Sequence, residues 1–178
     1  MAIHIRKATL EDIPALEELI EASARGLAGK HYTEEQVEAA LGTAWGVDTE
    51  LIRDGTYFAA DFDGKIVGCG GWSFRRTLFG SDNQANRQSE SLDRTSEPAR
   101  IRAFFVHPEY SGMGIATQIL ERCEQEARKH GFKSTALVST LSGHSFYLRH
   151  HYCGTDHKTY SLPHKLTIEF IPMTKYLA

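Results

Sequence analysis

The sequence lacks several features that would assign it to a specialised class of protein. Its cysteines are Cys69, Cys123 and Cys153, an odd number at unrelated spacings, so we expect free thiols in a reducing cytoplasm rather than a disulfide framework or a zinc knuckle. The net charge of −3 lacks the basic surplus of a typical nucleic-acid-binding domain. We therefore expect no nucleic-acid partner.

Long apolar runs are also missing. No run approaches the roughly 18 residues that a membrane span needs, and acidic residues interrupt the N-terminal segment before the apolar region of a signal peptide forms. We expect a cytoplasmic protein without a membrane partner. With 178 residues, 41% of them hydrophobic and 24% charged, the chain is expected to fold as a single domain over residues 1–178.

The chain alternates between strand and helix patterns. The predicted strands are residues 3–8, 56–62, 65–74, 100–106, 134–140, 158–162 and 165–171, and the predicted helices are 10–27, 34–42, 114–130 and 143–151. Thr33 with Gln36 predicts a capped helix start, and Asp63-Gly64 between two apolar runs predicts a hairpin. This order predicts an α/β (α+β) fold with a mixed, mostly antiparallel sheet of about six or seven strands and helices on both faces.

Residues 75–98 are polar and without periodicity, which predicts a long loop. A loop of this length inside a compact domain is usually functional or disordered. At its start, Arg75 and Arg76 fit either a contact with a phosphate or acidic acceptor, or a solvated loop edge.

The most informative segment is 101–127, which reads as a buried strand, a proline turn, a glycine-containing loop and an amphipathic helix. The unpaired amides and dipole of such a helix start favour an anion, and small residues let a pyrophosphate approach the backbone. The loop fails the dinucleotide fingerprint at its third glycine and lacks the Gly-Lys-Ser/Thr of a Walker loop. A phosphate-bearing ligand is therefore expected at residues 112–117.

Two motifs in order carry a resemblance to a known family. The first is VHPEYSGMGIA at 106–116, and the second is FYLRHHY at 146–152. Together with the order of elements they resemble the GCN5-related N-acetyltransferase superfamily, in which a strand ending in V-H-P precedes the pyrophosphate loop Q/R-x-x-G-x-G/A and a later helix carries F-Y-x-x-x-G-F. Ser111 departs from the usual Gln or Arg, and His151 stands at the glycine position.

The resemblance implies an acyltransferase that moves an acetyl group from acetyl-CoA to a primary amine by direct transfer in a ternary complex. It places acetyl-CoA against the strand before the loop, the loop itself, and two hydroxyls that stand where the family often uses an asparagine. These residues are Phe104, Phe105, Val106, Ser111, Gly112, Met113, Gly114, Ile115, Ala116, Thr117, Thr140 and Ser142.

The resemblance also places Tyr147 beside the thioester sulfur as the general acid. A phenol has a pKa of about 10 and is protonated at neutral pH; the alternative is an ordinary core tyrosine. The base remains open. Glu97, Glu109 and His107 are the nearest candidates, and a water-mediated route or an amine that arrives deprotonated fits equally well.

The acceptor is expected to enter between the first two helices and the 75–98 loop. A small amine, an amino acid, a protein N-terminus and a lysine all remain open, and Trp45, Trp72 and Phe79 indicate an apolar component. Five histidines crowd the C-terminal third, but their spacing does not complete a metal ligand set, so no metal is expected. A homodimer through the C-terminal strands or the sheet edge fits the resemblance.

Two other classes of function remain as alternatives. One is a non-catalytic acyl-CoA-binding sensor or regulatory protein that kept the cleft and lost turnover, which the Ser111 departure and the unassigned base allow. The other is a nucleotide-binding regulatory protein that uses the glycine loop for a different phosphate.

Overall fold

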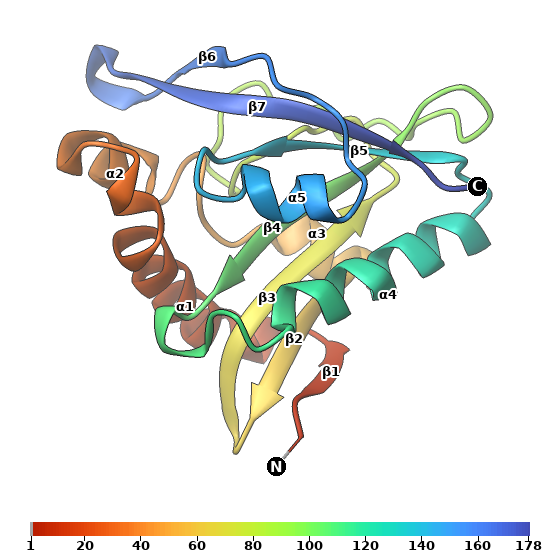
Figure 1. The fold of residues 1–178 in the computed structure, drawn as a ribbon, viewed down its shortest axis with the longest axis horizontal. Helices are drawn as coiled ribbons and strands as arrows, with labels where there is room; N and C mark the ends of the chain where they lie inside the picture. The colour runs from red at the N-terminus through yellow and green to blue at the C-terminus, as the bar shows by residue number, and fades with distance from the viewer. Residues whose placement is uncertain (1) are drawn as a thin grey trace.

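The computed structural model describes residues 2–178. Within them the chain forms a seven-stranded sheet of order β1-β2-β3-β4-β5-β7-β6 (Figure 1). The strands are β1 His4–Lys7, β2 Tyr57–Phe62, β3 Lys65–Ser73, β4 Ala99–Val106, β5 Ser134–Ser139, β6 Lys158–Ser161 and β7 Thr167–Tyr176. Neighbouring strands are antiparallel except β4 and β5, which are parallel. The predicted mixed, mostly antiparallel sheet is confirmed.

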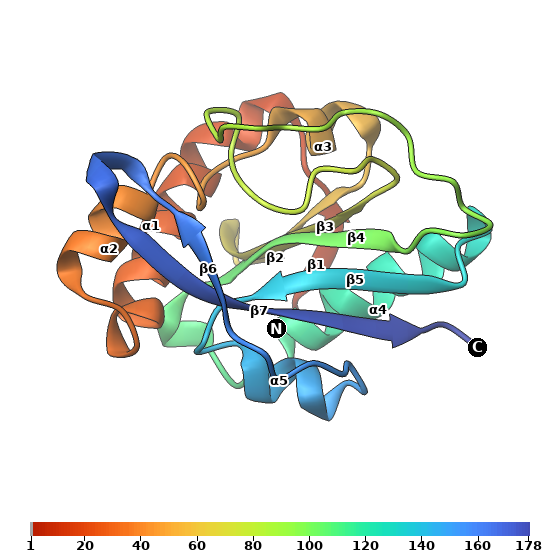
Figure 2. The same cartoon turned by 90° about the horizontal axis from the view of Figure 1, so that it is seen from above.

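Helices cover both faces of this sheet. They are α1 Ile13–Gly26, α2 Glu34–Ala40, α3 Thr49–Asp54, α4 Ile115–Lys129 and α5 His144–Arg149. Figure 2 shows α1 and α3 on one side and α4 and α5 on the other, with the long loop between β3 and β4 on the side of α3. No helix among residues 2–178 has the length and apolar character that crossing a membrane requires.

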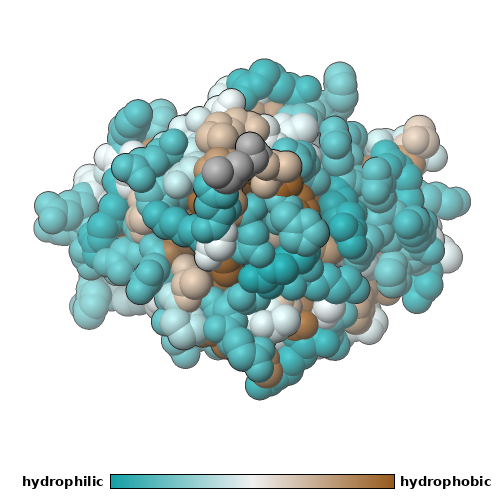
Figure 3. All heavy atoms as spheres, turned by 90° about the horizontal axis from the view of Figure 1, so that it is seen from below, coloured by the Kyte–Doolittle hydropathy of each residue, from teal (hydrophilic) through white to brown (hydrophobic). Residues whose placement is uncertain are grey.

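Successive side chains of β2 point to opposite faces of the sheet and belong to two separate hydrophobic cores. Tyr57 and Ala59 pack with the buried residues of α1, α2 and α3, while Phe58 and Ala60 pack with those of α4 on the opposite face. A strand buried on both faces reads as a continuous apolar run rather than an alternating one. The molecular surface contrasts with these apolar cores, since the face shown in Figure 3 is covered mostly by hydrophilic side chains.

Two local predictions are confirmed in detail. The Thr33 hydroxyl accepts a hydrogen bond from the Gln36 amide at 3.1 Å, and the Gln36 side chain accepts one from the Thr33 amide at 2.9 Å, so α2 begins with a capping box. Asp63 and Gly64 have φ of 52° and 76° and join β2 to β3. These left-handed values are what a tight hairpin turn requires.

Two elements differ from the prediction. The sequence pattern did not predict α3. Asp48 caps the start of this helix, since its side chain accepts a hydrogen bond from the Glu50 amide. The last strand was predicted to end at residue 171 but continues to Tyr176 in spite of Pro172. Proline is tolerated there because Pro172 has a strand partner on one side only. It pairs with Val138 of β5, whereas β6 pairs only with residues 167–170.

Candidate functional site

The central opening of the sheet lies between β4 and β5. These strands pair only at Ala99 with Thr135 and at Arg100 with Ala136, and β4 then runs away from β5 (Figure 1). The backbone of residues 101–106 therefore has no strand partner on its β5 side. Unpaired strand edges are ready to bind extended ligands that carry amide groups.

A β-bulge shapes the same stretch of β4. The register with β3 shifts between Cys69 and Gly71, and Ala103 has φ of 57°, a left-handed value that is strained for a residue with a Cβ. The Tyr57 hydroxyl holds the Ala103 carbonyl with a hydrogen bond of 2.9 Å. Burial raises the pKa of Tyr57 well above its ordinary value, so the hydroxyl stays protonated and keeps donating.

A cavity of about 450 Å³ occupies this opening. It extends from the start of α4, past β4 and β5, to the end of α1 and the long loop. Its lining includes seven residues predicted to serve the site, namely Phe104, Phe105, Val106, Ala116, Thr140, Ser142 and Tyr147. The predicted site residues from the strand, the loop and α5 are thus brought to one place.

The glycine loop leads from the cavity to the surface. Gly112 and Gly114 have φ of 78° and 81°, and the first amide that bonds back into α4 is that of Gln118, to the Gly114 carbonyl at 3.1 Å. Within residues 2–178, none of the six amides of 112–117 donates a hydrogen bond to a protein atom. Six free donors at the positive end of a helix form an anion cradle made of main chain.

The side chains of this loop are less free to bind a ligand than its backbone amides. The Ser111 hydroxyl donates to the Pro108 carbonyl at 3.1 Å, so it belongs to the turn. Thr117 Oγ1 lies 3.0 Å from His150 Nε2, and burial lowers the pKa of His150, which favours its neutral form. Gly112, Met113 and Ser111 are exposed at the surface beyond the cavity.

Tyr147 lies in α5 with its ring edge-on to Phe104, at a centroid distance of 6.4 Å. It is buried and lines the cavity, and burial raises the pKa of its phenol. In the part of the chain that the structure describes, its hydroxyl has no hydrogen-bond partner. A protonated phenol facing a cavity without a protein partner is free to bond to a ligand.

The turn before α5 is held by the hydroxyls predicted to replace the family's asparagine. Thr140 Oγ1 accepts from the Gly143 amide at 3.1 Å and lies 3.2 Å from Ser142 Oγ. Thr140 therefore caps the turn that positions α5, and Ser142 faces the cavity beside it.

The three base candidates lie away from the cavity. The Glu97 carboxylate pairs with Arg76, the Glu109 side chain is 78% exposed, and His107 Nδ1 accepts from the Glu109 amide at 3.2 Å as a turn cap. Among the described residues, no aspartate or glutamate lines the cavity. The site thus offers no carboxylate base.

The far end of the cavity is aromatic. Trp45, Phe79 and Phe170 line it, with Lys30 and His31 of the turn after α1. Of the three aromatic residues singled out in the sequence, Trp72 lies elsewhere, fully buried in the core beneath α4. The indication of an apolar component therefore applies only to Trp45 and Phe79.

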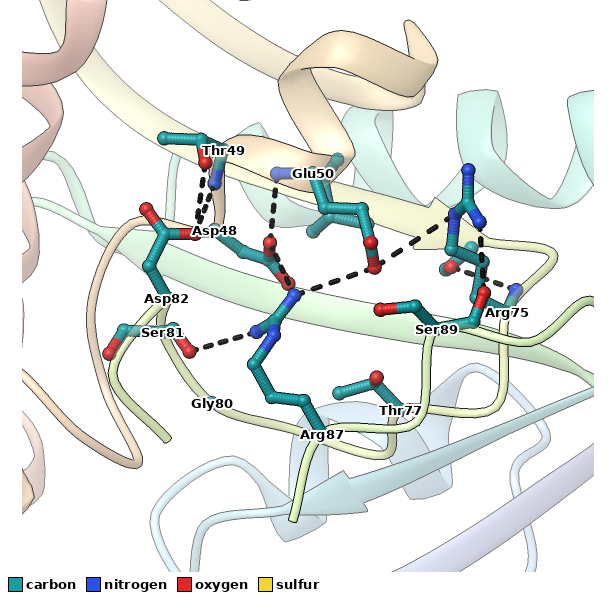
Figure 4. A network of polar contacts seen from close by, with 12 residues as sticks. Asp48, Thr49, Glu50, Arg75, Thr77, Gly80, Ser81, Asp82, Arg87 and Ser89 are labelled. Carbon is teal, nitrogen blue, oxygen red and sulfur yellow. Dashed lines mark hydrogen bonds and ion pairs between the residues drawn. The ribbon is translucent and has the colours of Figure 1, made fainter. Parts of the chain in front are cut away.

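A buried ionic network holds the wall of this end, and no sequence pattern predicts it. Arg102 of β4 is 2% exposed and donates to Asp48 at 2.7 Å and to the Gly80 carbonyl at 2.9 Å. Asp48, with no exposed surface, also pairs with Arg87 of the long loop at 3.0 Å (Figure 4). The partners lie 39 and 54 residues from Asp48, beyond any local pattern.

The two arginines at the start of the long loop are ion-paired within the chain. Arg75 forms a bidentate pair with Asp54 at 2.8 and 2.9 Å, and Arg76 pairs with Glu97. Their guanidinium groups fasten the long loop to α3 and to the segment before β4. This accounts for them as structural residues, so a phosphate role is not needed.

No group of three or more His, Cys, Asp or Glu side chains among residues 2–178 is arranged to hold a metal ion. His144, for example, bonds to the Gly154 carbonyl at 2.8 Å, and His157 lies 3.2 Å from Glu169. The crowding of histidines in the sequence reflects separate local roles.

Comparison with known proteins agrees with this geometry. The model of the acetyltransferase (GNAT) family matches residues 14–152. A GCN5-related N-acetyltransferase structure from Rhodopseudomonas palustris is 21% identical, covers 99% of this chain and 96% of its own, and gives a TM-score of 0.72. No curated protein sequence matches the chain.

Two similar structures contain the acyl carrier. The PaiA N-acetyltransferase from Thermoplasma acidophilum, in complex with coenzyme A, is 19% identical, with 99% of each chain covered and a TM-score of 0.64. The yncA acetyltransferase from Salmonella typhimurium, with acetyl-CoA, is 16% identical, covers 100% of this chain and 95% of its own, and gives a TM-score of 0.63.

Proposed function

This chain belongs to the acetyltransferase (GNAT) family, and on that premise we propose that it transfers an acetyl group from acetyl-CoA to a primary amine. The observation that carries the proposal is the row of six amides at 112–117 that, within residues 2–178, donate to no protein atom, together with Ala116 of this row in the lining of the cavity between β4 and β5. A pyrophosphate on those amides and a pantetheine arm along the unpaired edge of β4 together account for the cradle, the splayed strands and the cavity.

The transfer proceeds directly within a ternary complex. The amine nitrogen attacks the thioester carbon, whose oxygen becomes negative and is stabilised by backbone amides of residues 104–106. The carbon–sulfur bond then breaks and the electron pair leaves on sulfur. The Tyr147 phenol donates its proton to this sulfur, and the proton lost by the amine passes to solvent and restores the phenol.

Burial affects Tyr147 in two opposite ways. A raised pKa keeps the phenol protonated at neutral pH, as a proton donor must be. It also makes complete proton transfer to a free thiolate, whose conjugate acid has an ordinary pKa of about 8.5, unfavourable by itself. The phenol therefore stabilises the charge that builds up on sulfur as the carbon–sulfur bond breaks, and its proton passes to sulfur as solvent restores the phenol.

The proposal is tested by ligand-induced stabilisation followed by turnover. Acetyl-CoA should raise the melting temperature, because a ligand that binds only the folded state stabilises it by mass action, while ATP and NAD should leave it unchanged. A panel of primary amines should then release CoA. Stabilisation without CoA release from any amine supports the alternative of a non-catalytic acyl-CoA sensor, and stabilisation by ATP or NAD alone refutes both.

A further inference from the structure

The charge of the cavity restricts the acceptor. Its charged or titratable side chains among the described residues are Lys30, His31, Arg102 and Tyr147, and Arg102 is already paired with Asp48. An ammonium group entering the cavity would meet cations and no carboxylate. Burying an unpaired ammonium is costly, so such a site favours the neutral form of an amine.

Carboxylates do occur nearby, but in a different hollow. That hollow shares only Trp45 and Gly46 with the cavity and contains Glu17, Glu21, Glu38 and Asp82. Glu21 and Glu38 both pair with Arg25, and Asp82 accepts hydrogen bonds from the amide and hydroxyl of Thr49. Arg25 is the one cation among the described residues that line this hollow, so its four carboxylates are only partly neutralised, and they lie outside the lining of the reaction cavity.

The aromatic wall combines two buried rings with one ring from the long loop. Trp45 and Phe170 are 5% and 2% exposed, with centroids 6.4 Å apart. Phe79 comes from the long loop and packs edge-on against Phe170 at 5.5 Å and Tyr160 at 5.0 Å. An apolar or aromatic group placed here would be buried among aromatic faces and edges, which is favourable.

Resting on the acetyl transfer proposed above, we propose that the acceptor is a weakly basic primary amine that carries an apolar or aromatic group next to the nitrogen. The α-amine of an apolar amino-acid amide, or of a peptide with an apolar first residue, has this chemistry. With a pKa of about 7.7–8.0, roughly a third of such amines are unprotonated near pH 7.5, whereas a lysine amine of pKa about 10.4 is well under one per cent unprotonated. A cavity without a carboxylate base suits the first and not the second.

The test compares amines by CoA release at fixed acetyl-CoA. Phenylalanine amide should give the highest kcat/KM. Phenethylamine, which keeps the ring but is strongly basic, should be more than about tenfold worse near neutral pH and should approach phenylalanine amide as the pH rises. Glycine amide should be about tenfold worse because it lacks the apolar group. A tripeptide that begins with phenylalanine tests whether the acceptor is a peptide or a free amino-acid derivative.

A variant pair locates the apolar subsite. Phe79→Ala should reduce kcat/KM for phenylalanine amide several-fold more than for glycine amide, because only the larger acceptor loses a direct contact. Leu78→Ala is the matched control, since Leu78 is 42% exposed and does not line the cavity. It should change neither value.

The outcomes separate this inference from the proposed function. Preference for spermidine or for the side-chain amine of Nα-acetyl-lysine amide over phenylalanine amide overturns the inference and leaves acetyl transfer intact. Equal use of phenylalanine amide and phenethylamine at every pH also overturns it, without any variant having to fold. If no amine releases CoA, both fail together.

Discussion

The two ends of the cavity are built from different parts of the chain. At the end that faces α4, the groups that we propose hold acetyl-CoA are main-chain amides of residues 112–117 and the free edge of β4. At the opposite end the wall is made of side chains, with Trp45 and Phe79 lining it and the buried Asp48–Arg102 pair behind it.

The two ends of the cavity therefore depend on different properties of the chain. A main-chain cradle depends on backbone conformation, which two left-handed glycines provide. A side-chain wall depends on distant residues that must be buried and paired correctly. Damage to the first end should therefore appear mainly in acetyl-CoA binding, and damage to the second in stability and acceptor choice.

The largest expected effect is at the acceptor end, in Asp48→Ala. This change leaves the buried Arg102 guanidinium without its carboxylate partner and removes the cap of α3. We expect a loss of about 3–5 kcal/mol in the free energy of unfolding, measured by urea denaturation. Asp93→Ala, in the long loop between β3 and β4 and with side-chain hydrogen bonds to nearby Thr95, should cost about 1 kcal/mol or less.

The second residue of the pair tests the reason for that loss. Adding Arg102→Met to Asp48→Ala removes the unpaired charge and should recover part of the stability, because two apolar groups replace a broken ion pair. A double variant less stable than Asp48→Ala alone would contradict the explanation.

The next effect lies between the two ends, in Tyr147→Phe. Because its hydroxyl bonds to no protein atom within residues 2–178, the fold should keep its stability, while kcat falls about 100-fold with loss of the proton donor. The raised pKa of Tyr147 means that the phenol stays protonated as pH rises, so wild-type kcat should not decline through neutral pH on its account. An unchanged kcat and pH profile would remove Tyr147 as the acid, and Tyr110→Phe, outside the cavity, is the control.

The smallest effect concerns the cradle itself, in Gly114→Ala. A Cβ at this position meets no atom within 4 Å, so the cost comes from the left-handed backbone, about 1–2 kcal/mol. The KM for acetyl-CoA should rise roughly tenfold, equivalent to about 1.4 kcal/mol. Gly64→Ala carries a similar strain at the β2–β3 turn, with φ of 76°, and should leave this KM unchanged; equal KM values in the two variants would argue against the cradle.

The parts of the fold that follow local rules were predictable. The capping box of Thr33 and Gln36, the Asp63-Gly64 hairpin and the helix after the glycine loop each depend on residues close together in sequence. The short helix α3 was missed because a single turn and a half offers little periodicity, although Asp48 and the left-handed Gly55 mark its two ends.

The same distinction between local and long-range features applies to the candidate site. The cradle and the strand before it were predicted, since their spacing is local and their function depends on backbone. The Asp48–Arg102–Arg87 network and the pairing of Arg75 with Asp54 were not, because their partners are brought together only by the folded sheet. Trp72 was misplaced for a similar reason, since alternation along β3 decides which face of the sheet a side chain joins.

The bulge at Ala103 has a consequence for the thermodynamics of turnover. Its strained backbone is fixed from two strands away by the Tyr57 hydroxyl. The strain at this edge of β4 is therefore part of the free energy of folding, and under the proposed function acetyl-CoA binds an edge that the fold has already shaped.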